Sequence, residues 1–314
     1  MSYKKGFLLP LAAATLALPT HAFAAPERAT EFSYIGSINN TRHNLTQKAP
    51  GIANVFMDAY RNNYGEVCVY CHTPHGANGT INAPLWNRTN NFTDGKYTTY
   101  DALGTSTLTA SVSQPGVNSL TCLSCHDGTL GMDSIINMPG SGLYDTNQAS
   151  TSNTSFLDKW SSEGPGNASG TNPDPGTHWG LNTTECLSCH SNPGFPGAPD
   201  FSIAFIGTDL TNDHPIGIDI PTGRFGDDFT APSGSTTGSN WSLEYYDTNI
   251  NGRADKEEIR FYDTGSGARV ECASCHDPHG VIPRGSDPAT TQFNPTFLRI
   301  SNNESAVCQT CHAK

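Results

Sequence analysis

Five copies of one short pattern carry the chemistry of this sequence: two cysteines separated by two residues and followed directly by a histidine. We number them motif 1 (Cys68–His72), motif 2 (Cys122–His126), motif 3 (Cys186–His190), motif 4 (Cys272–His276) and motif 5 (Cys308–His312). The spacing C-x-x-C-H is the attachment signature of haem c, in which the two thiols bond one porphyrin and the histidine binds its iron. All 10 cysteines belong to these motifs, and they are Cys68, Cys71, Cys122, Cys125, Cys186, Cys189, Cys272, Cys275, Cys308 and Cys311. The sequence therefore predicts five covalent haems with the proximal ligands His72, His126, His190, His276 and His312.

Other uses of so many cysteines explain the pattern less well. A disulfide framework does not require a histidine after every second cysteine, and a zinc site has no reason to repeat that placement five times. A thioredoxin-like redox pair would rarely recur within one chain. Haem attachment accounts both for the repeated histidine and for the absence of a leftover cysteine.

Five further histidines are available for the opposite faces of the five irons. Besides His21 near the N-terminus and the motif histidines, the chain contains His43, His75, His178, His214 and His279. A second histidine lowers the potential of a haem, a methionine raises it, and an open position admits a substrate. The equal numbers favour two histidines on every iron, although Met132 or Met138 is an alternative ligand for the second haem. His75 and His279 lie only three residues after their own motifs, so we expect each to bind a neighbouring haem.

The first residues predict export. Lys4 and Lys5 precede an apolar run over residues 7–19, and Ala-Phe-Ala at 22–24 resembles a cleavage site. We interpret residues 1–24 as a signal peptide. No later stretch is long enough to cross a bilayer, so we expect no membrane span. The expected location is extracellular or at the cell surface, and otherwise the periplasm.

The composition is poor in residues that form a core. Only 35% of residues are hydrophobic, whereas 31 are glycine and 21 are proline. Porphyrin plates would supply the missing apolar surface. We therefore expect residues 25–314 to form a single domain with an N-terminal arm at 25–50. The predicted fold is mostly irregular, with short α-helices at the motifs and a minor β-hairpin, and forms a loop-rich shell around a chain of five covalent haems.

The charge of the chain bears on its partners. Its formal net charge is −12, and removal of residues 1–24 takes away two lysines and no acid, which leaves −14. Such a surface disfavours nucleic acid and anionic membranes, and it favours cationic partners or surfaces of minerals and metal cations. The same acidity is equally explained by solubility alone.

Residues 247–258 match the calcium-loop pattern D-x-N-x-N-G-x5-E. The pattern assigns side-chain oxygens, one main-chain carbonyl and a closing carboxylate to Asp247, Asn249, Asn251, Arg253, Asp255 and Glu258. The alternative is an acidic solvated turn without a metal. The next residues, 259–271, alternate around a glycine-containing turn at 263–267, which predicts a hairpin leading into motif 4.

Several of these segments resemble multihaem c-type cytochromes with doubled C-x-x-C-H motifs. The similarity lies in residues 122–129, 272–280 and 213–217 and in the calcium-like loop before motif 4. It covers the haem segments and not the loops, which make up most of the length. The sparse layout is also similar to extracellular cytochromes that polymerise into conductive filaments. In that group a histidine of one subunit can bind a haem of the next, which implies a homopolymer with His43 as a candidate for this role.

The hypothesis that follows is an electron-transfer protein and not an enzyme. Five low-spin haems would pass single electrons between a redox donor protein and an acceptor, either another protein or an external metal or mineral. A second interpretation is a multihaem reductase of the nitrite or sulfur-oxyanion type, which requires one open iron. A third is an adhesion or scaffold protein with haems too far apart for exchange.

Overall fold

Short helical turns are the main regular structure in the described part of the chain. The computed structural model describes residues 37–45, 67–88, 95–132, 135–136, 180–196, 198, 200–263, 265, 267–282 and 292–313. The α-helices are α2 (Val117–His126), α3 (Cys186–Cys189), α4 (Cys272–Cys275) and α5 (Ala306–Cys311). The 3-10 helices are η1 (Ile38–Asn40), η2 (Val67–Tyr70), η3 (Tyr100–Leu103), η7 (Ser202–Ala204), η8 (Thr222–Arg224), η9 (Pro295–Phe297) and η10 (Asn303–Ser305). Within these described ranges, no helix has the length and apolar character needed to cross a membrane.

Every motif lies on a helical turn. Motif 2 ends α2, the cysteines of motifs 3, 4 and 5 lie on α3, α4 and α5, and motif 1 begins within η2. In motifs 1, 3, 4 and 5 the histidine N–H donates to the carbonyl of the first cysteine, with N···O distances of 2.8, 3.0, 3.0 and 2.9 Å. Residues three apart lie on the same side of such a turn, so the two thiols of each motif are neighbours.

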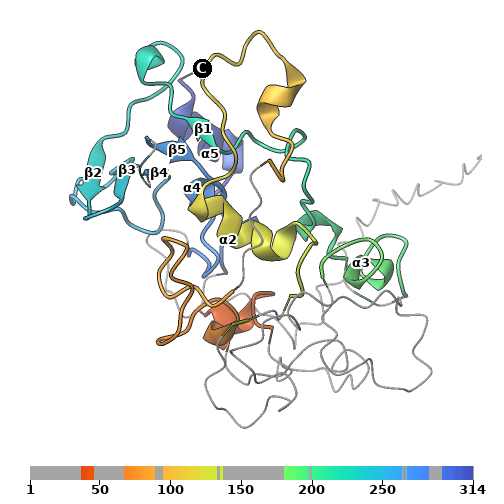
Figure 1. The fold of residues 1–314 in the computed structure, drawn as a ribbon. Helices are drawn as coiled ribbons and strands as arrows, with labels where there is room; N and C mark the ends of the chain where they lie inside the picture. Colours follow the sequence, from red (N-terminus) through yellow and green to blue (C-terminus); the bar gives the residue numbers. More distant parts are fainter. Residues whose placement is uncertain are drawn as a thin grey trace, which may run out of the picture.

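A five-stranded antiparallel sheet lies beside the helices (Figure 1). Its strands, in the order β1-β5-β4-β3-β2, are β1 (Ile218–Asp219), β5 (Arg269–Val270), β4 (Arg260–Asp263), β3 (Ser242–Tyr245) and β2 (Gly234–Thr237). β4 and β5 occupy the positions of the predicted hairpin, with Tyr262 opposite Arg269. The sheet is larger than one hairpin. Its outer strand β2 reads Gly-Ser-Thr-Thr, which lacks the apolar alternation by which a strand is predicted.

Apolar side chains form three small clusters, each beside a motif. The cluster at motif 1 contains Val69, Tyr70 and Ile135, and the cluster at motif 2 contains Tyr97, Leu123 and Leu210. The third lies between the sheet and motifs 4 and 5, and its buried members are Ile220, Tyr246, Ile259 and Phe261. Apolar packing in the described part of the chain is therefore divided among the motifs.

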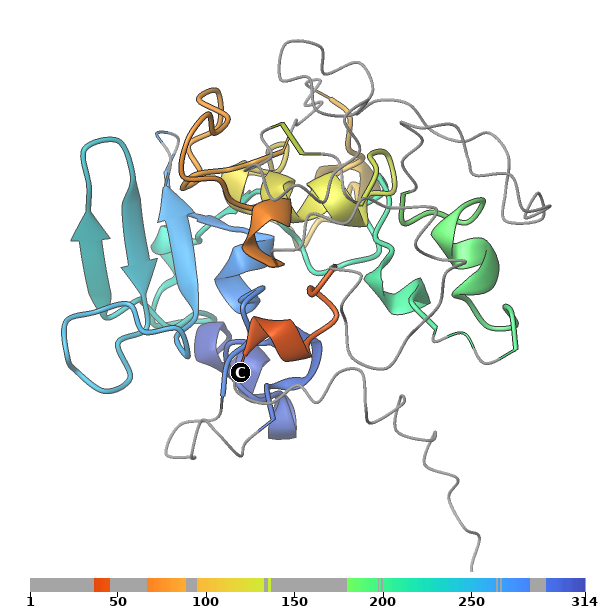
Figure 2. The same ribbon diagram turned by 90° about the horizontal axis from the view of Figure 1, so that it is seen from below.

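The spatial order of the motifs differs from their order in the sequence. α2 packs against α4, and both views show α3 on the far side of α2 from α4 and α5 (Figures 1 and 2). Motif 4 thus lies beside motif 2, although motif 3 separates them in the chain.

Candidate functional site

The ring of His72 in motif 1 lies opposite the ring of His279, which follows motif 4. Their centroids are 6.1 Å apart and their planes differ by 11°. Two imidazoles that bind one metal from opposite sides, each through a nitrogen about 2.0 Å from the metal and about 1.1 Å from its ring centre, have centroids about 6.2 Å apart. The separation of these two rings fits that arrangement.

A second pair joins His126 of motif 2 to His43 of the N-terminal arm. The centroids are 6.2 Å apart and the planes differ by 77°. The ring of His43 also stacks on Phe297 at 4.4 Å, and its Nδ1 lies 2.8 Å from the carbonyl oxygen of Pro278. These contacts hold residues 37–45 of the arm against the rest of the described chain. His43 therefore faces motif 2 of its own chain, and its role as a ligand to a haem of the next subunit stays a prediction.

His214 lies in the neighbourhood of His312 of motif 5. Burial is the main cause that lowers the pKa of His214, and the neighbouring His312 lowers it further. Pro215 follows His214 and fixes the local backbone, and its carbonyl oxygen lies 3.0 Å from Nδ1 of the His214 ring. A spare histidine therefore lies near a motif histidine here as well.

In six of the described histidines the Nδ1 atom lies against an oxygen acceptor. The main-chain contacts are His43 to Pro278 at 2.8 Å, His72 to Pro84 at 2.9 Å, His126 to Ala204 at 2.6 Å, His214 to Pro215 at 3.0 Å and His276 to Thr296 at 2.7 Å. The sixth is His279, which contacts the carboxylate of Asp277 at 2.9 Å. An oxygen acceptor requires the proton on Nδ1, so the lone pair lies on Nε2. A histidine that binds a metal through Nε2 usually donates its Nδ1 proton in this way, which fixes the tautomer and the orientation of the ring.

Burial keeps most of these imidazoles neutral. It is the main cause that lowers the pKa of His72, His126, His214 and His276, and it lowers the pKa of His43 to about 4. The pKa of His279 is instead raised by its hydrogen bond to Asp277. A neutral imidazole is the form that binds a metal ion, so burial of these five rings favours the form that a ligand needs.

For the predicted ligands His75, His178 and His190, no contact with another histidine ring is given above. His178 lies outside the described residues. The main-chain carbonyl of His75 accepts a hydrogen bond from the hydroxyl of Thr73 at 2.8 Å. The ring of His190 in motif 3 stacks on Phe201 at 4.2 Å with planes 8° apart. The structure thus places two spare histidine rings opposite motif histidines, and the assignment of His43, His75, His178, His214 and His279 as second ligands stays a prediction.

The cysteines of different motifs are also neighbours. A hydrogen bond between the thiols of Cys122 and Cys272 is the main cause that raises the pKa of Cys122 and lowers that of Cys272. Burial, followed by the neighbouring Cys125, raises the pKa of Cys71 to about 12. Motif 2 therefore lies against motifs 1 and 4.

The contacts extend this array to motifs 5 and 3. Burial and then Cys311 of motif 5 raise the pKa of Cys275 in motif 4 to about 12. Motif 3 is joined to motif 2 through residues 201–204, since Phe201 contacts His190 and the carbonyl of Ala204 contacts His126. All ten cysteines are described, and none forms a disulfide. The five motifs thus form one continuous array.

The calcium-like loop is closed by its own hydrogen bonds. The buried carboxylate of Glu258 accepts hydrogen bonds from the main-chain N–H groups of Thr248 at 2.7 Å and Asp255 at 3.1 Å. The side-chain amides of Asn249 and Asn251 donate to Asp255 at 2.6 and 2.8 Å. No three His, Cys, Asp or Glu side chains in the described ranges converge as ligands of a free metal ion would. Calcium binding by Asp247, Asn249, Asn251, Arg253, Asp255 and Glu258 therefore stays a prediction.

Several residues around the motifs were not found from the sequence. They are the buried charged side chains Arg88, Glu271 and Arg299, together with Asp277. One signal for Asp277 was available, because motif 4 continues as Cys-His-Asp-Pro-His whereas motif 1 continues as Cys-His-Thr-Pro-His. The buried arginines carry no such signal, since charged residues are usually exposed.

No known family model matches this chain, and no curated protein sequence matches it significantly.

Proposed function

We propose that this chain is an exported electron-transfer protein with five covalent haems, each held between two histidines. The observation that carries the proposal is the pair of opposed imidazole contacts, His72 with His279 at 6.1 Å and His126 with His43 at 6.2 Å. Each contact joins a motif histidine to a spare histidine. Each bound haem supplies a one-electron couple, and the chain supplies axial ligation, spacing and burial.

The two ring contacts and the position of His214 near His312 also suggest how the other ligands are shared. His72 with His279, His126 with His43 and His312 with His214 would serve motifs 1, 2 and 5. His75 and His178 then remain for the irons of motifs 3 and 4. With this assignment every iron would have two histidines, as a carrier without a catalytic site requires.

The contacts between motifs support a route for electrons. Motif 3 adjoins motif 2, motif 2 adjoins motif 4, and motif 4 adjoins motif 5. Motif 1 adjoins motif 2 through Cys71 and motif 4 through His279. The predicted signal peptide and the net charge of −14 after its removal favour an external, cationic or mineral acceptor.

The test is a haem count by pyridine haemochrome with a low-temperature EPR spectrum of the oxidised, exported protein. We expect five haems for each chain, all low-spin. A stoichiometric high-spin signal would instead mean one open iron, as a multihaem reductase requires.

Replacement of one opposed histidine tests the pairing. His279→Ala should retain five haems and convert one of them to the high-spin form, because the iron at motif 1 would lose its second ligand. Trp86→Phe is the matched control: the Trp86 ring lies 6.2 Å from the ring of His72, but the indole cannot bind iron. A His279→Ala spectrum identical to the parent would remove His279 from the set of ligands.

A further inference from the structure

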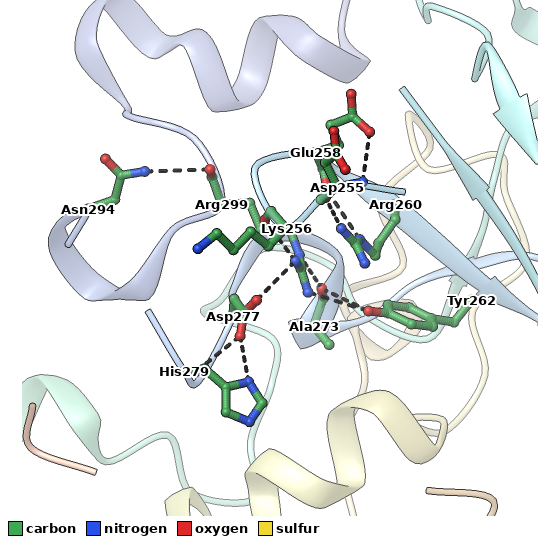
Figure 3. Close-up of polar contacts among 10 residues, drawn as sticks. All are labelled: Asp255, Lys256, Glu258, Arg260, Tyr262, Ala273, Asp277, His279, Asn294 and Arg299. Atoms are coloured by element: carbon green, nitrogen blue, oxygen red, sulfur yellow. Dashed lines mark hydrogen bonds and ion pairs between the residues drawn. The ribbon is translucent and has the colours of Figure 1, made fainter. Parts of the chain in front are cut away.

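The ring of His279 contacts a carboxylate, that of Asp277. Among the six described histidines with an Nδ1 contact given above, this is the one whose acceptor is a side chain. Nδ1 of His279 lies 2.9 Å from Oδ1 of Asp277, whereas the other five rings contact main-chain carbonyls. The same carboxylate oxygen accepts the main-chain N–H of His279 at 3.0 Å. Figure 3 shows both contacts. The carboxylate is thus fixed relative to the ring by two hydrogen bonds.

Arg299 holds the other oxygen of this carboxylate. Its Nη1 lies 3.5 Å from Oδ2 of Asp277 and donates to the carbonyl of Lys256 at 2.9 Å. Its Nε donates to the carbonyl of Ala273, within motif 4, at 3.0 Å. The Arg299 side chain is only 5% exposed. Arg299 therefore ties the carboxylate to α4 and to the loop before β4.

Equivalent positions in two other motifs are used differently. In motif 1 the residue after the histidine is Thr73, whose hydroxyl donates to the carbonyl of His75. In motif 2 it is Asp127, whose carboxylate accepts hydrogen bonds from Lys96 at 2.7 Å and Tyr97 at 2.8 Å. Asp277 is directed instead to a histidine ring that faces another motif.

We propose that Asp277, held by Arg299, is a positioning residue that makes His279 a stronger electron donor and lowers the reduction potential of the haem at motif 1. This inference rests on the proposed function. A carboxylate draws the Nδ1 proton more strongly than a neutral carbonyl does, so Nε2 donates more charge and favours the oxidised iron. The haem at motif 1 is then less readily reduced than it would be if Nδ1 of His279 faced a neutral carbonyl.

The test is a redox titration followed by EPR, on the parent and on Asp277→Asn. Nearly parallel imidazole planes give a rhombic low-spin signal, and nearly perpendicular planes give a strongly anisotropic one, so the His72–His279 and His43–His126 pairs can be distinguished from each other. The rhombic centre followed here is the one whose signal is lost in His279→Ala, which assigns it to motif 1. We expect Asp277→Asn to keep five haems and to raise the potential of the rhombic centre by at least about 28 mV, a threefold change in its one-electron equilibrium constant. The anisotropic centre should not change.

Two further variants separate positioning from general disturbance. Asp277→Glu retains the carboxylate and should restore most of the parent potential, whereas Asp277→Thr copies motif 1 and should shift it as Asp277→Asn does. Asp127→Asn is the matched control and should leave the rhombic centre unchanged. An unchanged rhombic centre in Asp277→Asn, or equal shifts in Asp277→Asn and Asp127→Asn, would overturn the inference. A parent protein without five low-spin haems would refute the proposed function itself.

Discussion

Arg88 shows how single side chains hold the motifs together. It is fully buried, and Nη2 donates to the carbonyls of Ser124 at 2.9 Å and Gly131 at 2.8 Å. Nη1 donates to the carbonyl of Met132 at 2.9 Å, and Nε donates to the Ser124 hydroxyl at 3.1 Å. A planar guanidinium can satisfy four acceptors in different directions. Arg88 thereby joins the segment after motif 1 to α2 and the loop that follows it.

Arg88→Lys should destabilise the protein although it keeps the charge. The ammonium group cannot reach all four acceptors, and each buried acceptor left without a donor costs about 1–3 kcal/mol. We expect a loss of about 2–4 kcal/mol in the free energy of unfolding, measured by urea denaturation of the haem-loaded protein. The exposed Arg253 supplies the control, since Arg253→Lys should change stability by less than about 0.5 kcal/mol. Equal effects of the two changes would contradict this role for Arg88.

At the scale of elements, Glu271 joins the beginnings of α2 and α4. Both of its carboxylate oxygens accept the main-chain N–H of Gly116 at 3.1 Å, and the Ser119 hydroxyl donates to one of them. The Ser119 oxygen in turn accepts the main-chain N–H of Cys272 at 2.9 Å. Burial raises the pKa of Glu271 to about 7, although these hydrogen bonds act in the other direction and lower it. The contact between motifs 2 and 4 thus contains an acid that titrates near neutral pH.

This raised pKa predicts how stability depends on pH. A carboxyl whose pKa is higher in the folded state binds more protons in that state than in the unfolded state. Its stabilising contribution to the free energy of unfolding is therefore fully present below about pH 4.5 and is lost as the pH rises to about 7. Glu271→Gln removes this dependence. The stability of the variant relative to the parent should therefore improve between pH 4.5 and 7, by up to about 3 kcal/mol. The measurement is urea denaturation across that range, with exposed Glu304→Gln as the control. Parallel pH profiles for parent and Glu271→Gln would contradict the prediction.

Helical turns at the motifs can be predicted from the sequence, because two cysteines three residues apart must present their thiols on one side. The elements against which those turns pack cannot be predicted in this way. Motif 2 packs on motif 4 through Glu271 and Ser119, contacts between segments about 150 residues apart that no local pattern records. The same limit applies to His279, whose spacing excludes its own iron but does not say that His72 would face it.

At the scale of the whole molecule, charge should govern exchange with small redox reagents. The net charge of −14 after removal of the predicted signal peptide attracts cations. Reduced protein should therefore be oxidised faster by a cationic metal complex than by an anionic one of similar potential. The difference should shrink as the Debye length falls from about 30 Å at 0.01 M salt to about 8 Å at 0.15 M. Stopped-flow rates that do not depend on salt for either reagent would show that the haems exchange electrons away from the acidic surface.

The opposition of His72 and His279 also has a consequence for the order of events during secretion. If the chain is exported and loaded with haem as proposed, it emerges from its N-terminus, and motif 1 then reaches the haem-attachment machinery more than two hundred residues before His279 does. His43, by contrast, precedes its facing histidine and is already outside when motif 2 arrives. In the proposed protein, the iron at motif 1 consequently has a single protein ligand until the last part of the chain has crossed. Chains stopped before residue 279 would then carry a haem open to peroxide and carbon monoxide, and ligation at motif 1 would be complete only when the segment after motif 4 reaches it.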